Sequence, residues 1–257
     1  MVFNFLRLRC PIPLPCGGLS GLVSQCALCR SWPADPVCLP CLTRFNPVQR
    51  RCSLCALLLP ADLSGGSRAL PTVCLPCQRH PPPITQTLAV VSYAYPWSGL
   101  IRQYKFGNHP GWAPFFTRLM LQNSSINHCL SDLAPADWVL PLPLSPQRLQ
   151  TRGFNQSWLL TQQLARHSHT AARADARLLV RIRDTRPQSQ LLRGERLTNV
   201  KGAFMVDPLR AHQLVGRHVV LVDDVMTSGA SIYTAAQALQ YAGAAQVTAL
   251  ILARTEP

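Results

Sequence analysis

The segment VVLVDDVMTSGAS, residues 219–231, carries the clearest structural signal in the chain. Four apolar residues, typical of a buried strand, run directly into Asp223 and Asp224. A short Thr/Ser/Gly segment follows, and apolar residues at helical spacing come after it. Together these features predict one strand–turn–helix unit of an α/β domain, with polar groups at the carboxyl end of the strand.

The same alternation of strand and helix patterns extends over the chain from Thr87 onward. The expected strands are TLAVVSYAYP (87–96), DWVLPLPLS (137–145), RHVVLVDD (217–224) and AQVTALILART (245–255), with RLLVRIR (177–183) as a strand or sheet edge. The expected helices are WSGLIRQYKFG (97–107), PFFTRLMLQ (114–122), NQSWLLTQQLARHSH (155–169) and SIYTAAQALQYAGA (231–244). This order predicts a mostly parallel, twisted sheet flanked by helices.

Residues 1–86 differ in texture, because they hold many prolines and ten of the 11 cysteines. Eight of these cysteines form four C-x2-C pairs: Cys26/Cys29, Cys38/Cys41, Cys52/Cys55 and Cys74/Cys77. Two such pairs supply the four thiolates of a tetrahedral zinc site. We therefore expect a Cys-rich, structural zinc-binding module over residues 1–86, followed by the α/β domain over residues 87–257.

The sequence leaves the arrangement of the zinc ligands open. Eight ligands fit two zinc ions, either with neighbouring pairs joined in sequence or with alternate pairs joined by cross-bracing. Cys10 and Cys16 have a different spacing and are not assigned as ligands.

The charge of the chain is strongly basic, with 25 Lys and Arg residues against 11 Asp and Glu residues and a net charge of +14. Only Lys105 and Lys201 are lysines. Arginine binds phosphate groups in a bidentate manner, so phosphate-bearing partners are favoured, although an arginine-rich codon usage would give the same composition. No apolar run reaches the roughly 18 residues of a membrane span, and we expect a cytoplasmic protein without membrane insertion.

Asp223 and Asp224 have a chemical interpretation. Carboxylates accept hydrogen bonds from a sugar diol, whereas the amides of a loop that opens a helix bind a phosphate. This loop consists of Thr227, Ser228, Gly229, Ala230 and Ser231. The combination predicts a site for a ribose 5-phosphate. Adjacent residues of a strand point to opposite faces, so only one aspartate would face this site unless the chain turns after Asp223.

The chain also resembles a known family. VVLVDDVMTSGAS is similar to the ribose-phosphate motif of type I phosphoribosyltransferases, although Ser228 and Ser231 stand where threonine is frequent. The cysteine pairs, YKFGNH (104–109), PLPLSPQRLQTRGFNQS (141–157), RDTRPQSQLLRGERLTNVKGAF (183–204) and LILART (250–255) extend the resemblance to the ComF family, which contains ComFC-like competence proteins and GntX-like DNA-utilisation proteins. The resemblance implies a type I phosphoribosyltransferase-like fold preceded by a small four-cysteine-type zinc-binding module.

Specific residues take roles from this resemblance. Asp223 and Asp224 would hold the ribose hydroxyls of phosphoribosyl pyrophosphate, and residues 227–231 would bind its 5-phosphate. The loop from Leu142 to Ser145 corresponds to the pyrophosphate loop, and Mg²⁺ would bridge pyrophosphate and ribose. The candidate pyrophosphate ligands are Arg148, Arg152, Arg183, Arg186, Arg196 and Lys201.

The resemblance implies a phosphoribosyltransferase, a glycosyltransferase of pentosyl groups, that takes part in DNA uptake or utilisation. Nothing in the sequence names the acceptor. Two other functions remain open: an accessory protein that binds single-stranded DNA alongside uptake or recombination proteins, and a sensor that binds phosphoribosyl pyrophosphate without turnover.

Overall fold

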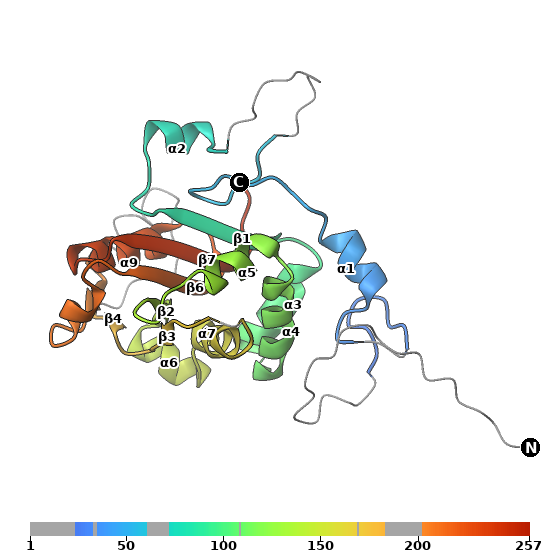
Figure 1. Cartoon of the computed structure of the whole chain (residues 1–257). Helices are drawn as coiled ribbons and strands as arrows, with labels where there is room; N and C mark the ends of the chain where they lie inside the picture. The colour runs from blue at the N-terminus through green and yellow to red at the C-terminus, as the bar shows by residue number, and fades with distance from the viewer. Residues whose placement is uncertain (1–23, 33–34, 61–71, 108, 169, 183–201) are drawn as a thin grey trace, which may run out of the picture. The chain divides into compact units, whose positions relative to one another are not determined.

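The structure is a computed structural model of the chain that describes residues 24–32, 35–60, 72–107, 109–168, 170–182 and 202–257 (Figure 1). The chain divides into two compact units, residues 1–45 and residues 46–257. In the smaller unit, helix α1 (Leu39–Phe45) follows a turn that brings Ala27 N to within 2.9 Å of Pro36 O.

The larger unit is built on a five-stranded sheet in the order β1-β7-β6-β2-β3. All its neighbouring strands pair in parallel. Its strands are β1 (Gln86–Ser92), β2 (Trp138–Pro141), β3 (Arg173–Ala174), β6 (His218–Met226) and β7 (Gln246–Arg254). The α/β class and the parallel sheet expected from the sequence are confirmed.

A second, two-stranded sheet is antiparallel and joins β4 (Leu179–Arg181) to β5 (Phe204–Val206). The segment 177–183, expected as a strand or sheet edge, therefore supplies a short strand outside the main sheet. Among its described residues, the larger unit has helices α2 (Leu75–Arg79), α3 (Trp97–Phe106), α4 (Ala113–Leu121), α5 (Ser124–Ser131), α6 (Pro146–Arg152), α7 (Gln156–His167) and α9 (Ala230–Tyr241), with short 3-10 helices at Pro110–Trp112 and Ala211–Leu214.

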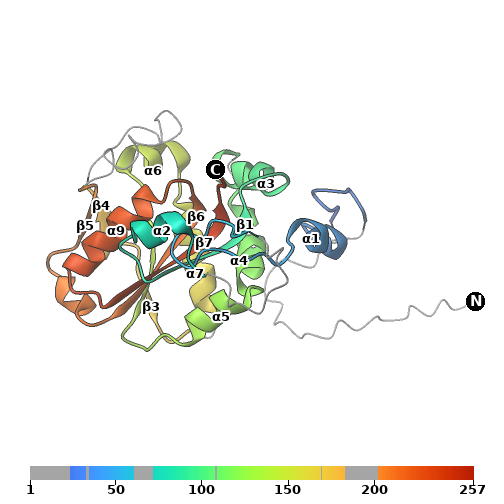
Figure 2. The same cartoon turned by 90° about the horizontal axis from the view of Figure 1, so that it is seen from above.

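Helices cover both faces of the main sheet. Helix α7 packs against β2, β6 and α4, whereas α9 packs against β5, β6 and β7. The connections β2–α7–β3 and β6–α9–β7 run in opposite directions across the sheet, and right-handed crossovers then place α7 and α9 on opposite faces. Figure 2 looks onto the face that carries α9.

The strand order reverses between β6 and β2, and this position determines where a ligand can bind. In open α/β sheets, ligands bind outside the carboxyl ends of the strands at such a switch point. The carboxyl end of β6 holds Asp223 and Asp224, and the loop after β2 starts at Leu142, whose N–H donates to Val222 O at 2.8 Å. The topology thus brings the two loops assigned from the sequence to one edge of the sheet.

The predicted domain boundary stays a prediction beside the division into compact units. The sequence places it near residue 86, whereas the structure divides the chain after Phe45. Described residues before the sheet contact it and the segment after β7: Ser53 O accepts from Thr87 N at 2.7 Å, and Arg51 Nη1 pairs with Glu256 Oε1 at 2.9 Å.

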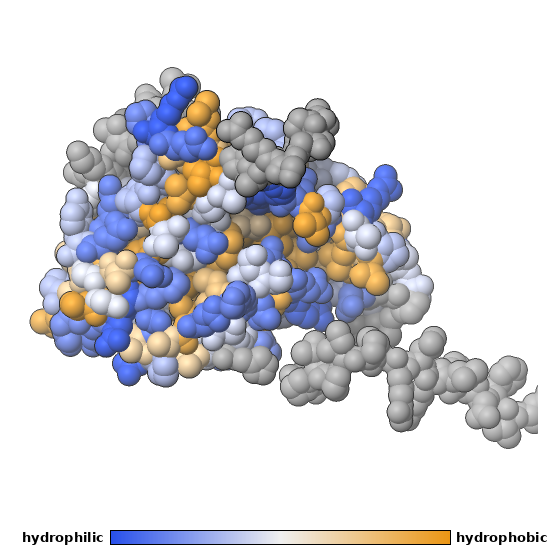
Figure 3. All heavy atoms as spheres, turned by 45° about the horizontal axis from the view of Figure 1, so that its top comes forward, coloured by the Kyte–Doolittle hydropathy of each residue, from blue (hydrophilic) through white to orange (hydrophobic). Residues whose placement is uncertain are grey.

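Hydrophobic and hydrophilic residues are interspersed on the face seen in Figure 3. Across the described residues, no helix combines the length and the apolar character that crossing a membrane requires.

Candidate functional site

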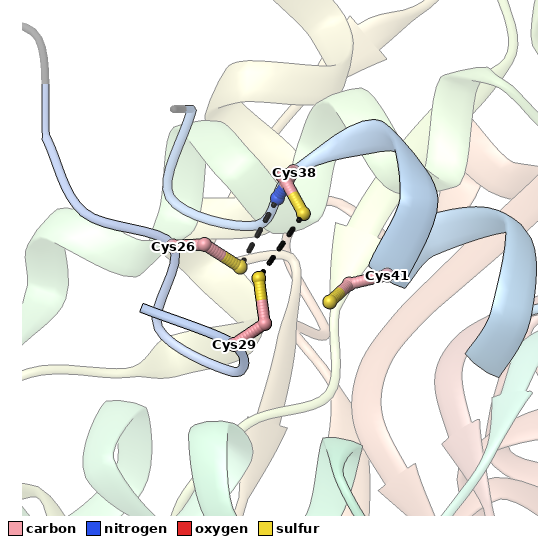
Figure 4. Close-up of side chains that lie close together, drawn as sticks. All are labelled: Cys26, Cys29, Cys38 and Cys41. Carbon is pink, nitrogen blue, oxygen red and sulfur yellow. Dashed lines mark hydrogen bonds between the residues drawn. The ribbon is translucent and has the colours of Figure 1, made fainter. Parts of the chain in front are cut away.

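The first group of cysteines lies in the smaller unit and contains Cys26, Cys29, Cys38 and Cys41 (Figure 4). Their sulfur atoms all lie within 4.8 Å of one another, and Cys29 Sγ is 3.6 Å from Cys38 Sγ. Zn–S bonds of about 2.3 Å in a tetrahedron put sulfur atoms about 3.8 Å apart. The backbone N–H of Cys38 also points at Cys26 Sγ, at 3.3 Å.

The second group has the same construction in the larger unit. Cys52, Cys55, Cys74 and Cys77 have sulfur atoms within 4.8 Å of one another, with Cys55 Sγ 3.5 Å from Cys74 Sγ and Cys74 N 3.3 Å from Cys52 Sγ. Neighbouring pairs are therefore joined in sequence, and cross-bracing is excluded for these eight cysteines.

The protonation equilibria of the thiols indicate that each group suits a cation. Burial raises the pKa of Cys26, but backbone N–H groups of Cys29, Cys38 and Leu28 outweigh it and lower the pKa to about 6. Burial and the neighbouring thiols raise the pKa of Cys41 to about 12. Cys52 and Cys55 repeat this contrast, with pKa values of about 7 and about 12. Four clustered sulfur atoms are the ligand set of a tetrahedral zinc site, so both groups could hold zinc.

At the carboxyl end of β6, the strand continues through both aspartates. Asp223 is in register with Ile251 of β7, and the pairing persists to Met226, opposite Arg254. The chain therefore does not turn after Asp223, and the two aspartates leave the strand on opposite faces. Val219 and Leu221, on the same face as Asp223, pack in one apolar cluster with α9.

Asp223 connects β6 to α7 and to the loop that opens α9. Its Oδ1 accepts hydrogen bonds from Ser157 Oγ and from Asp224 N, both at 2.9 Å. Burial and the charge of Asp224 raise the pKa of Asp223 from 3.8 to about 7. Asp223 lines a small depression together with the loop residues Thr227, Gly229, Ala230 and Ser231.

Asp224 contacts the end of α3. Its Oδ1 lies 2.9 Å from Lys105 Nζ, and the two side chains are only 6% and 17% exposed. The second carboxylate oxygen, Oδ2, is buried without a hydrogen-bond partner among the described residues. A buried carboxylate oxygen with unused acceptor capacity suits a hydroxyl donor or a cation.

The loop after β6 has the geometry of an anion site. Gly229 adopts φ +82 as the N-cap residue of α9, and a Cβ built there would lie 2.5 Å from the Tyr233 ring. Glycine is therefore required for both the backbone conformation and the space. Ser228 Oγ accepts from Ala230 N at 3.4 Å, and because Gly229 has no side chain to cap the helix, the N–H groups that follow are suited to an anion, which the helix dipole also favours.

Helix α6, which follows β2, carries Arg148 and Arg152, the two arginines that were assigned from this part of the sequence. Ser145 Oγ accepts from Arg148 N at 3.4 Å to cap α6, and Asn155 Oδ1 accepts from Ser157 N at 3.0 Å to cap α7. The Arg152 guanidinium donates to Gln156 Oε1 at 2.7 Å and lies over the Phe106 ring at 4.9 Å. Burial lowers the pKa of Arg152, while the charges of Asp224 and Asp223 act in the opposite direction, which places this guanidinium within electrostatic reach of both carboxylates.

The other residues assigned from the sequence, Arg183, Arg186, Arg196 and Lys201, fall outside the described residues, as do the unassigned Cys10 and Cys16. Two residues that the structure adds to the site, Lys105 and Ser157, had no assigned role in the sequence. YKF at 104–106 resembles the end of an ordinary amphipathic helix, and only its membership of the block YKFGNH hinted at a role for Lys105.

The sequence of the chain is similar to those of several known bacterial proteins. No family model matches it. It is 36% identical over 220 residues to "DNA utilization protein YhgH" of Escherichia coli (strain K12), covering 85% of this chain and 90% of that protein. It is 28% identical to "Competence protein F" of Haemophilus influenzae, over 70% of this chain and 78% of that protein, and 26% identical to "Competence protein ComFC" of Bacillus subtilis, over 93% and 98%. Similarity of this extent shows that the chain belongs to the ComF family.

Proposed function

We propose that the chain has a type I phosphoribosyltransferase-like fold and binds phosphoribosyl pyrophosphate with Mg²⁺ at the carboxyl end of β6. The observation that carries the proposal is the small depression that Asp223 lines together with the loop that opens α9. A carboxylate beside a helix N-terminus suits a ligand that has hydroxyl donors next to a phosphate.

In this proposal, the two ends of the site bind different parts of the ligand. The N–H groups and hydroxyls from Thr227 to Ser231 hold the 5-phosphate. Asp223 accepts hydrogen bonds from the ribose hydroxyls, and Ser157 fixes the orientation of its carboxylate through the 2.9 Å hydrogen bond. Asp224 leaves the strand on the opposite face, but its partner Lys105 lies beside Gln156, the neighbour of Ser157 at the start of α7. Its Oδ2 is buried without a partner among the described residues, and in this proposal Asp224 is the second acceptor.

The pyrophosphate group requires positive charge. Arg148 and Arg152 follow the loop after β2, and Arg152 lies within electrostatic reach of both aspartates. Arg183, Arg186 and Lys201, which lie outside the described residues, complete the proposed set. The carboxylates are donors of the type that Mg²⁺ prefers, and the ion would neutralise charge on the pyrophosphate when bound with it.

The proposed reaction is the transfer of phosphoribose to an acceptor with release of pyrophosphate. Isothermal titration calorimetry with phosphoribosyl pyrophosphate and Mg²⁺ tests the binding step, and an acceptor screen that measures pyrophosphate release tests turnover. Binding with pyrophosphate release supports an enzyme, whereas binding without release in any acceptor supports a sensor. Absence of binding would contradict both.

We also propose that the protein takes part in DNA uptake or utilisation and that it does so in the cytoplasm. This role is supported by the relatives named as DNA utilization and competence proteins. The net charge of +14 favours a second candidate function, the binding of single-stranded DNA through its phosphates, next to uptake or recombination proteins. Fluorescence anisotropy with a labelled oligonucleotide over a salt series tests this candidate: affinity should fall steeply with salt, and no binding at moderate salt would reject it.

A further inference from the structure

Arg254, the last residue of β7, connects the second cysteine group to the loop that opens α9. The side chain is buried, at 4% exposure. Its Nε donates to Cys55 O at 2.7 Å. Its Nη1 donates to Met226 O at 3.0 Å and also to Thr227 O. One guanidinium thus bonds to the backbone of a cysteine in the group and to the backbone at the start of the loop.

The cysteine side of this connection is fixed to the sheet. Thr87 Oγ1 donates to Leu54 O at 2.8 Å, and Arg51 Nη1 donates to Ala56 O at 2.9 Å. A metal ion held by Cys52, Cys55, Cys74 and Cys77 would determine the backbone position of Cys55, whose carbonyl accepts from Arg254. The arrangement of the sulfur atoms fits such an ion, as described above.

Apolar packing makes a second connection between the same two parts. Ala56, next to Cys55, is fully buried in the cluster that also contains Met226, Ala230 and Ile232. The Tyr233 ring packs against this cluster and occupies the space beside Gly229. A displacement of residues 55–56 would therefore disturb the loop by two independent contacts.

We propose that Arg254 is a positioning residue that links occupancy of the second cysteine group to the order of the loop 226–231. Metal bound at this group holds the loop in the conformation that binds an anion, and loss or oxidation of the group loosens it. The consequence for phosphate binding rests on the proposed function, but the link itself does not require any ligand.

Hydrogen–deuterium exchange on the full chain, without ligand, tests the link. Cys55→Ser with Cys74→Ser removes the second metal, and Cys29→Ser with Cys38→Ser is the matched control that removes the first. The second-group variant should exchange about tenfold faster at the amides of residues 226–231, because buried hydrogen bonds that hold the loop are lost. Amides of residues 248–252 in β7 serve as the reference for global unfolding.

Arg254 itself is tested with metal bound. Arg254→Met should raise exchange of the loop while elemental analysis still finds the zinc content of the unaltered chain, and Arg254→Lys should show a smaller effect. Arg51→Met, which affects the same cysteine segment without a bond to the loop, is the control. Equal loop exchange in Arg254→Met and Arg51→Met, or unchanged exchange after loss of the second metal, would overturn the proposal. The exchange experiment contains no ligand, so its outcome does not depend on whether the chain binds phosphoribosyl pyrophosphate.

Discussion

Asp223 and Asp224 are adjacent on β6, yet they contact helices from different parts of the chain. Asp223 accepts from Ser157 of α7, and Asp224 pairs with Lys105 of α3. Each carboxylate has its own partner, and the end of α3 contacts the start of α7 through Tyr104 Oη, which donates to Gln156 O at 2.8 Å. The double aspartate therefore provides two separate acceptors on β6 rather than an acid/base pair.

The Lys105–Asp224 pair yields a stability prediction. Lys105→Met leaves a buried carboxylate without its cation and should reduce the free energy of unfolding by about 3 kcal/mol. Arg102→Met, on an exposed position of the same helix, should change it little. Chemical denaturation measures both. Adding Asp224→Asn to Lys105→Met should restore part of the loss, and an equal effect of Lys105→Met and Arg102→Met would contradict a structural pair.

Asp223 yields a prediction about pH. Its pKa in the folded chain is about 7, above the ordinary value of 3.8, so the folded state binds the proton more tightly than the unfolded state. This residue therefore contributes stability below about pH 4, and that contribution is lost as the pH rises to about 7. Asp223→Asn should raise the melting temperature at pH 8 and have little effect at pH 3.5.

The control for this pH experiment is Asp132→Asn, an exposed carboxylate on the C-cap of α5. It should not reproduce the gain at pH 8. If Asp223→Asn lowers the melting temperature at pH 8 more than at pH 3.5, the carboxylate of Asp223 is stabilising as an anion and the assignment of its pKa is wrong.

Gly229 yields a prediction about the loop. Gly229→Ala places a methyl group against Tyr233 and forces a side chain into φ +82, so it should lower stability by about 1–3 kcal/mol and weaken phosphate binding. Gly99→Ala, in α3 with open space around its Cβ position, should be neutral or raise stability by up to about 1 kcal/mol. Thermal unfolding compares the two variants, and equal effects would remove the special role of Gly229.

The two cysteine groups predict the metal content. Elemental analysis of the purified chain should find two zinc ions, one for each group of four sulfur atoms. Removal by a chelator should lower the melting temperature of the larger unit, because the second group lies within it. A content below one zinc per chain would contradict the zinc assignment.

Local patterns in the sequence predicted much of this fold. The apolar run before Asp223, the helical spacing after Gly229 and the C-x2-C pairs are each formed by residues that are close in sequence, so they are visible without the structure. The strands and helices expected from residue 87 onward accordingly appear, with β6 extending two residues past Asp224.

Long-range contacts account for what the sequence did not predict. The ion pair of Lys105 with Asp224 and the bond of Arg254 to Cys55 join residues that are far apart in the chain, and no periodicity reports them. The same kind of contact assigns the second cysteine group to the larger unit. The pairing of the cysteine groups also required the structure, because the C-x2-C spacing fits both arrangements.

The central claim is that the carboxyl end of β6 binds phosphoribosyl pyrophosphate through its aspartates. Calorimetry with this ligand and Mg²⁺ should show saturable binding to the unaltered chain and to Asp132→Asn. The variant that combines Asp223→Asn with Asp224→Asn should lose that binding while retaining a cooperative unfolding transition. Unchanged affinity in the double variant, or no binding to the unaltered chain, would contradict the account.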